Sequence, residues 1–175
     1  MQNIPREDVI TMIHEATASV FSTMLSLPVD WQLSRQEQGE PAPVDGVVAL
    51  VGIAGSWTGT GRIYCSPEFA RVVAGALLMT EFPAVDADVL DAVAEVANMI
   101  IGNLKTTLEE RLGPLALSVP TVIFGRNYQA RTSSIHDWTV VPLRCGDHTM
   151  DIRFCLMPTP VPVRLPHLRH EPTAV

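Results

Sequence analysis

The chain has 175 residues, of which 47% are hydrophobic and 18% are charged, and its formal net charge is -7. This length fits one domain, and this apolar content is enough for a buried core and excludes a disordered chain. The negative charge argues against nucleic acid as a partner, because phosphate binding needs a concentrated Lys/Arg surface.

Neither a leader nor a membrane span is expected from the sequence. The opening residues, MQNIPREDVI, have no basic region followed by an apolar run, so no signal peptide is predicted. No window approaches the ~20 apolar residues of a membrane-spanning helix. The three cysteines (Cys65, Cys145 and Cys155) are far apart and form no CxxC pair, which is typical of reduced thiols. We therefore expect a soluble, cytoplasmic protein with no membrane partner.

A first helix is predicted after Pro5, where apolar residues recur at helical intervals up to Pro28. Its expected apolar stripe includes Val9, Val20 and Met24. The polar run SRQEQGEPAP, residues 34–43, is predicted to be an exposed loop.

Two β-rich runs, residues 46–55 and 58–66, flank the turn-like GSWTG and predict a hairpin. A second helix should follow, with Ser66 as N-cap and Pro67 at the first helical position. A third helix is predicted from about Asp88 to Leu112, with Asp86 or Asp88 as its cap and Gly113 after its end.

The C-terminal half predicts further strands. Residues 115–125 read as one strand, which Pro120 restricts to an edge or bulged position, and residues 138–146 and 148–158 predict a second hairpin. Because strands come as hairpins, the expected fold class is α+β, with a mostly antiparallel sheet and long helices packed on it. We expect a domain at 1–157 and a proline-rich extended tail at 158–175.

Polar residues interrupt the third helix at regular spacing. Its apolar side should face the sheet and consists of Leu90, Val93, Ala97, Ile100, Leu104 and Leu108. Asp91, Glu95, Asn98 and Gly102 follow steps of four, three and four residues and should form a second stripe that points away from the core. Small or apolar residues, Ala92, Ala94 and Met99, are expected beside it. Such a low strip would let another protein approach closely, although periodicity alone favours an ordinary solvated face.

The stretch DAVAEVANMIIGNLKTTLEERLGPLALSVPTVI resembles the central motif of the CheX/CheC/FliY family of chemotaxis phosphatases. That motif has Asp or Ser, then Glu four residues later, Asn three residues after that, and a proline some twenty residues on. Asp91, Glu95, Asn98 and Pro120 stand at these places. The resemblance covers the chain from about Val9 to Met157 and implies a CheC-like fold.

The resemblance also implies an activity. Family members remove the aspartyl phosphate of CheY-like response-regulator receivers, and the receiver supplies the phosphoaspartate, Mg²⁺ and a lysine. By similarity, Asn98 would position the attacking water and Glu95 would pair with the receiver lysine, while Asp91, Met99 and Gly102 would contact the partner. No cofactor or metal would be bound by this chain itself.

One motif per chain resembles CheX rather than CheC, because the first helix has Ala18 where a second Asn would fall. CheX-like members are homodimers, so a homodimer is expected. Two other interpretations stay open: a non-catalytic adaptor that docks on a receiver or a flagellar-switch protein through the same helix, and an inert structural dimer. The adaptor has no need of Asn98, and an intact Glu-Asn pair therefore favours the phosphatase.

Overall fold

A computed structural model describes residues 4–39, 44–128 and 137–159. The helical segments are α1 (Arg6–Val20), the π-helix η1 (Phe21–Leu25), α2 (Pro67–Leu78) and α3 (Ala87–Leu112). The strands are β1 (Asp30–Trp31), β2 (Arg35–Gln38), β3 (Val44–Gly55), β4 (Trp57–Cys65), β5 (Leu115–Leu117), β6 (Thr121–Tyr128), β7 (Asp137–Cys145) and β8 (His148–Pro158).

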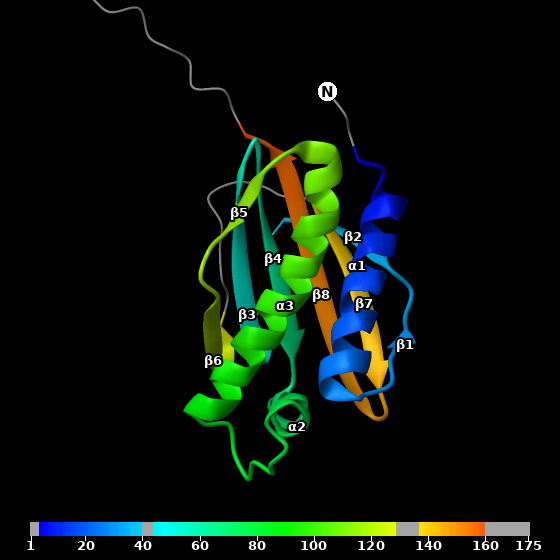
Figure 1. The fold of residues 1–175 in the computed structure, drawn as a ribbon. Helices are drawn as coiled ribbons and strands as arrows, with labels where there is room; N and C mark the ends of the chain where they lie inside the picture. The colour runs from blue at the N-terminus through cyan, green and yellow to red at the C-terminus, as the bar shows by residue number, and fades with distance from the viewer. Residues whose placement is uncertain (1–3, 40–43, 129–136, 160–175) are drawn as a thin grey trace, which may run out of the picture.

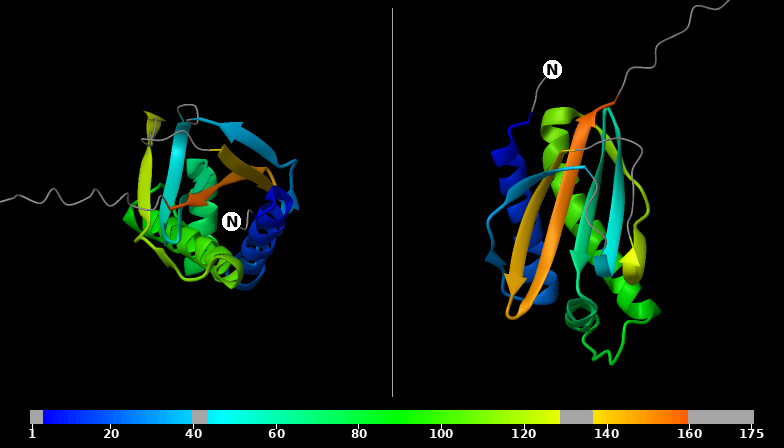
Figure 2. Two further views of the ribbon diagram at one scale, coloured as in Figure 1. Left: turned by 90° about the horizontal axis from the view of Figure 1, so that it is seen from above. Right: turned by 180° about the vertical axis from the view of Figure 1, so that it is seen from behind.

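The strands form one antiparallel sheet. Its order is β1-β7-β8-β4-β3-β5, with β2 also paired to β7 and β6 also paired to β3. Helices α1 and α3 lie side by side over one face, and α2 closes the lower end (Figure 1; Figure 2 shows the sheet from behind). The expected α+β class, with an antiparallel sheet and long helices packed on it, is confirmed.

Both predicted hairpins are confirmed. Strands β3 and β4 pair from Val47↔Cys65 to Ile53↔Gly59, and β7 and β8 pair across the turn at Gly146. Ser66 caps α2 as predicted, because its hydroxyl accepts a hydrogen bond from the Phe69 N–H at 3.1 Å.

The core lies between the helices and the sheet. Side chains from α1, α2 and α3 pack there against alternate residues of the central strands. The approach of α3 is close at Gly61 of β4, where a Cβ atom would overlap the side chain of Ile101. Gly61 therefore lets α3 lie directly on the middle of the sheet.

Two predictions about strands were wrong. Residues 35–38 of the expected loop form β2, which pairs with β7. The side chain of Glu37 accepts hydrogen bonds from Arg35 and Arg153, so ion pairs hold this polar strand at the sheet edge. The expected single strand 115–125 is two strands, β5 and β6, separated around Pro120, which has no N–H for a ladder bond.

The end of the first helix also differs from the prediction. After Val20 the chain widens into one π-helical turn that ends at Ser26, a left-handed residue with φ 53°. The wider turn shifts the side-chain register, and Met24, expected in the apolar stripe, is 48% exposed.

Cys65, Cys145 and Cys155 are buried, free thiols, as expected. Burial raises the pKa of Cys65 to about 12. Among the described helices, none is both long and apolar enough to cross a membrane. Strand β8 ends at Pro158, and residues 160–175, most of the predicted tail at 158–175, lie outside the described residues.

Candidate functional site on helix α3

Helix α3 is fixed at both ends by its own sequence. The carboxylate of Asp86 accepts a hydrogen bond from the Val89 N–H at 3.0 Å, which selects Asp86 rather than Asp88 as the cap. At the other end Gly113 has φ 78°, a conformation that favours glycine, and its N–H donates to the Glu109 carbonyl at 3.0 Å. The 26-residue helix is therefore a defined support for any side chains on its outer face.

The inner side of α3 is confirmed as a core face. Val93, Ala97, Ile100, Leu104 and Leu108 are buried as predicted, and Leu90 is half-buried. Ala92, which was expected beside the polar stripe, is instead only 4% exposed and belongs to the core. The buried side of α3 is thus wider than the single predicted stripe, because α2 and α1 pack on the flanks of α3 as well.

The predicted polar stripe lies on the outer side, and we call its four members, Asp91, Glu95, Asn98 and Gly102, the α3 strip. Asp91 and Glu95 are exposed, whereas Asn98 and Gly102 are half-buried. Within the described part of the chain, the side chains of Asp91, Glu95 and Asn98 make no hydrogen bond or ion pair. Their polar atoms are therefore available to another molecule.

The edges of the α3 strip are shaped by small and apolar groups. Ala94 and Met99 are half-buried beside it, and an added Cβ at Gly102 would have open space around it. The hydroxyl of Thr106 donates to the Gly102 carbonyl at 3.0 Å, so it turns back onto the helix rather than outward. The surface is therefore low around Gly102.

The cation nearest along the helix is already engaged. Lys105 forms an ion pair with Glu109 at 2.8 Å, and Glu109 also accepts a hydrogen bond from the Leu115 N–H at 2.8 Å. The backbone N–H of Leu115 lowers the pKa of Glu109, and Lys105 adds to this. Among the described residues, the Glu95 carboxylate is therefore left without a cation to pair with.

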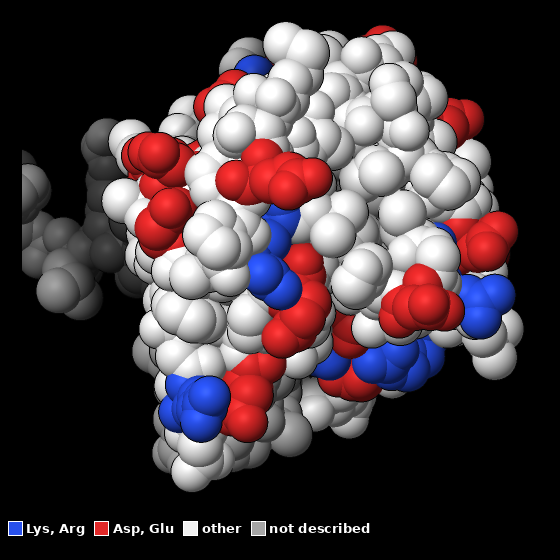
Figure 3. Space-filling model, turned by 90° about the horizontal axis from the view of Figure 1, so that it is seen from below, with Lys and Arg blue, Asp and Glu red and all other residues white. Residues whose placement is uncertain are grey.

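The structure extends the stripe by one acid that the sequence analysis left out. Asp88 is exposed and precedes Asp91 by three residues, so it continues the same side of α3 toward its beginning. Continuing the spacing by one more step would have found it. Figure 3, seen from below, shows acidic side chains spread over the end of the molecule where α3 begins, with basic side chains set among them. Asp88, Asp91 and Glu95 make this side of α3 negatively charged.

Pro120, the last residue of the predicted motif, is not on α3. It is half-buried in the connection between β5 and β6, where Ser118 is hydrogen-bonded to Gly52 of β3. Over the described ranges, no group of three or more His, Cys, Asp or Glu side chains is placed to hold a metal ion.

Comparison with known proteins agrees with this arrangement. The sequence model of the family described as chemotaxis phosphatase CheX matches residues 47–144, which include α2, α3 and most of the strands from β3 to β7. This protein belongs to the CheX family of chemotaxis phosphatases. A search of curated proteins gave no match to the sequence.

Solved structures show the same fold. The chemotaxis protein CheX from Vibrio vulnificus has 22% identity and a TM-score of 0.76, over 86% of this chain and 99% of that chain. CheX from Desulfovibrio desulfuricans has 24% identity and a TM-score of 0.74, over 86% and 99%. The complex of CheX with CheY, BeF3 and Mg²⁺ from Borrelia burgdorferi has 26% identity and a TM-score of 0.70, over 85% and 97%.

Proposed function

We propose that this protein removes the phosphoryl group from the aspartyl phosphate of a CheY-like receiver domain, with Asn98 and Glu95 as the two residues of its site. The observation that carries the proposal is the α3 strip itself. A carboxylate and a carboxamide stand one turn apart on a capped helix, both without a partner in the described part of the chain. Family membership and the solved complex of a similar CheX with CheY support a receiver as the substrate.

The chemistry needs little from this chain beyond position. A water oxygen attacks phosphorus in line, and the bond between phosphorus and the aspartyl oxygen breaks. The products are inorganic phosphate, which keeps the protons of the water, and the free aspartate carboxylate of the receiver. The carboxamide of Asn98 accepts a hydrogen bond from the water and donates one to a phosphoryl oxygen, which holds the water in line. Because an amide does not titrate near neutral pH, Asn98 does this without a tuned pKa.

Glu95 and the rest of the α3 strip serve docking. Glu95 pairs with the receiver lysine and so sets the register in which Asn98 enters the active site. Asp91 adds negative charge along the same side, and Met99 supplies apolar contact area. Gly102 keeps the surface low, so that the partner backbone can come close.

The receiver supplies the Mg²⁺, which neutralises charge on the phosphoryl group during transfer. The complex of a similar CheX that contains CheY together with Mg²⁺ supports this division of labour. A homodimer and a cytoplasmic site of action remain predictions. Light scattering at micromolar concentration tests the dimer, and a monomeric mass would contradict it.

The test is the decay of a phosphorylated receiver from the same organism, with Mg²⁺, in the presence of the wild type, Asn98→Ala or Asn103→Ala. Asn103 is the matched control, because it is an exposed asparagine on the same helix but outside the strip. We expect the wild type and Asn103→Ala to accelerate decay, and Asn98→Ala to lose about a hundredfold or more of that acceleration.

Asn98→Ala should unfold at the same temperature as the wild type or slightly above it, because alanine is the better helix former. Equal acceleration by Asn98→Ala would refute the role of Asn98. If the wild type binds the receiver but does not accelerate decay of the phosphorylated form, an adaptor that docks through the same helix would be favoured.

A further inference from the structure

A pocket of about 340 Å³ lies at the end of the molecule where α1 begins, bounded by α1, β2, β7, β8 and the start of β4. None of its lining residues belongs to the α3 strip. Its volume falls in the range of pockets that hold small ligands.

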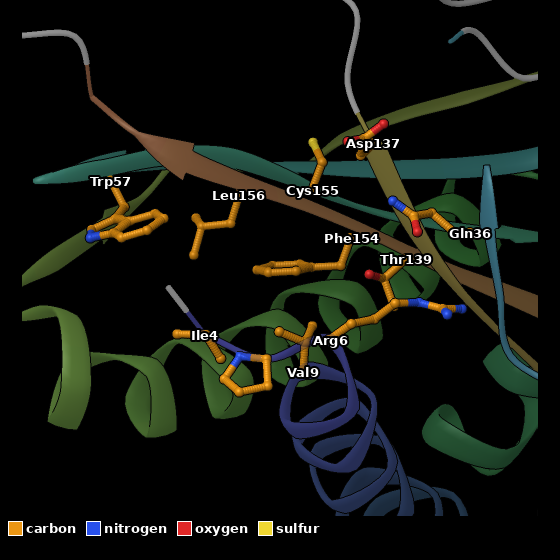
Figure 4. A pocket seen from close by; sticks show the side chains of 11 residues that line it. Ile4, Arg6, Val9, Gln36, Trp57, Asp137, Thr139, Phe154, Cys155 and Leu156 are labelled. Atoms are coloured by element: carbon orange, nitrogen blue, oxygen red, sulfur yellow. The ribbon is translucent and has the colours of Figure 1, made fainter. Parts of the chain in front are cut away.

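The two ends of the pocket differ in character. In Figure 4, Trp57 and Leu156 lie toward one end, the ring of Phe154 lies in the middle, and the guanidinium of Arg6 lies toward the other end, near Gln36. The apolar end is continuous with the protein core, because Trp57 and Leu156 pack against it and Phe154 is part of it. The pocket is therefore amphipathic along its length.

Strand register explains the order of these side chains. Gln36 pairs with Thr139, and Thr139 pairs with Phe154, so one row crosses β2, β7 and β8 on the helix-covered face. The row changes from amide to hydroxyl to aromatic ring as it approaches the sheet centre. A ligand lying along it would meet hydrogen-bonding groups at the edge and apolar surface inside.

Arg6 lies at the polar end of the pocket, and the residue as a whole is half-buried. Its Nε atom is buried and makes no hydrogen bond, and within the described residues its guanidinium forms no ion pair. Its neighbour in the helix, Asp8, is engaged by Arg111 instead. The beginning of α1 also lacks a capping side chain, since Pro5 stands at the N-cap, and this leaves the positive end of the helix dipole at the same place. A half-buried cation with one buried N–H donor that has no acceptor, beside a pocket with an apolar end, is an arrangement that an anionic ligand completes.

We propose that this pocket binds a small amphipathic carboxylate, with its anionic group on Arg6 and its apolar body on Phe154, Leu156 and Trp57. Thr139 and Gln36 supply further hydrogen bonds to the carboxylate. The site is separate from the α3 strip, and the proposal does not depend on the phosphatase activity.

The lining also contains one acid, Asp137, among the residues described. In Figure 4 its carboxylate lies beside Cys155 and points away from Arg6, with Gln36 and Thr139 between the two. At that position it weakens anion binding through its charge rather than by taking the place of the ligand. Asp137→Asn is therefore expected to strengthen binding, which gives the test a variant of opposite sign.

The experiment is a titration of the full ¹⁵N-labelled chain with 4-phenylbutyrate and with octanoate, followed by amide and indole N–H chemical shifts. We expect saturable shifts at millimolar concentration, centred on the start of α1, Trp57 and β8. Binding should weaken about tenfold or more for the neutral 4-phenylbutyramide and for Arg6→Gln, because each removes the charge-assisted hydrogen bonds. Arg126→Gln is the matched control, since Arg126 is an exposed arginine on β6 outside the pocket.

Four results would overturn the proposal: no shift with either acid, shifts centred elsewhere, equal affinity for acid and amide, or full affinity in Arg6→Gln. The spectrum of unliganded Arg6→Gln shows whether that variant is folded. If it is not, Asp137→Asn decides, because unchanged or weaker binding of 4-phenylbutyrate there contradicts a charge-dependent site at this pocket.

Discussion

Replacing Gly102 by alanine should make this protein more stable. Gly102 is inside α3, its φ is not among the positive values, and an added Cβ would meet no atom within 4 Å. The methyl group therefore gains no packing and causes no clash, and the change reduces to the helix propensity difference of about 0.8–1.0 kcal/mol in favour of alanine. For a chain of this size that corresponds to a rise in melting temperature of roughly 2–4 °C.

Thermal unfolding at fixed protein concentration measures this directly. A lower melting temperature for Gly102→Ala would contradict either the open space around Gly102 or its helical backbone conformation. The functional half of the prediction uses a larger side chain. Gly102→Leu should also fold stably, because leucine is nearly as good a helix former as alanine. Its side chain would stand where the receiver has to approach.

Gly102→Leu should therefore weaken receiver binding about tenfold or more, which is the cost of roughly 1.4 kcal/mol of lost contact. Asn103→Leu, on an exposed neighbouring position outside the strip, controls for added hydrophobic surface. Receiver affinity that is equal in Gly102→Leu and the wild type would refute close docking over this part of α3.

Gly61→Ala should have the opposite sign to Gly102→Ala: its methyl group overlaps Ile101, so we expect about 1–3 kcal/mol of destabilisation in a denaturant titration, and a stable variant would contradict the close packing of α3 on β4. Glu95→Gln should weaken receiver binding, measured by fluorescence anisotropy, more than it slows hydrolysis at saturating receiver; unchanged binding would count against pairing with a lysine. Burial raises the pKa of Glu37, but hydrogen bonds from Arg35 and Arg153 outweigh this and lower it below the usual 4.5. The stabilisation from ionised Glu37 is therefore present above that value and is lost as pH falls through the lowered pKa in the folded state. Glu37→Gln should lower the free energy of unfolding by roughly 1 kcal/mol or less at neutral pH. This difference in stability between the variant and the wild type should disappear in acid. A difference in stability that stays constant with pH would show that the charge of Glu37 is not its cause.

The helices were predictable because their signals are local. Ser66 and Asp86 are caps, Gly113 is a terminator, and apolar residues recur at the helical period, so the start of α2 and both ends of α3 were predicted nearly correctly. The α3 strip followed from the same periodicity. Its functional meaning did not, because spacing alone cannot separate a docking surface from a solvated face.

The errors concern elements that depend on distant residues. Strand β2 is polar and was read as a loop, because its backbone partners on β7 and its ion-pair partners Asp151 and Arg153 all lie about a hundred residues away or more in the sequence. The pocket was also invisible, because Arg6, Gln36, Thr139 and Phe154 come from four separate elements and no local pattern connects them. Strand register and sheet topology bring such residues together, and neither can be predicted from a short segment of the sequence.

The two sides of α3 are under different physical constraints. Ile101 and its inward neighbours determine whether the chain folds, whereas Asp91, Glu95 and Gly102 face outward and contribute little to the core. Substitutions can therefore accumulate on the outer side of the helix while the buried side stays constant. If the proposed function holds, a small library at Asp91, Met99 and Gly102, with Glu95 and Asn98 retained, is a direct route to redirecting this scaffold toward other receivers.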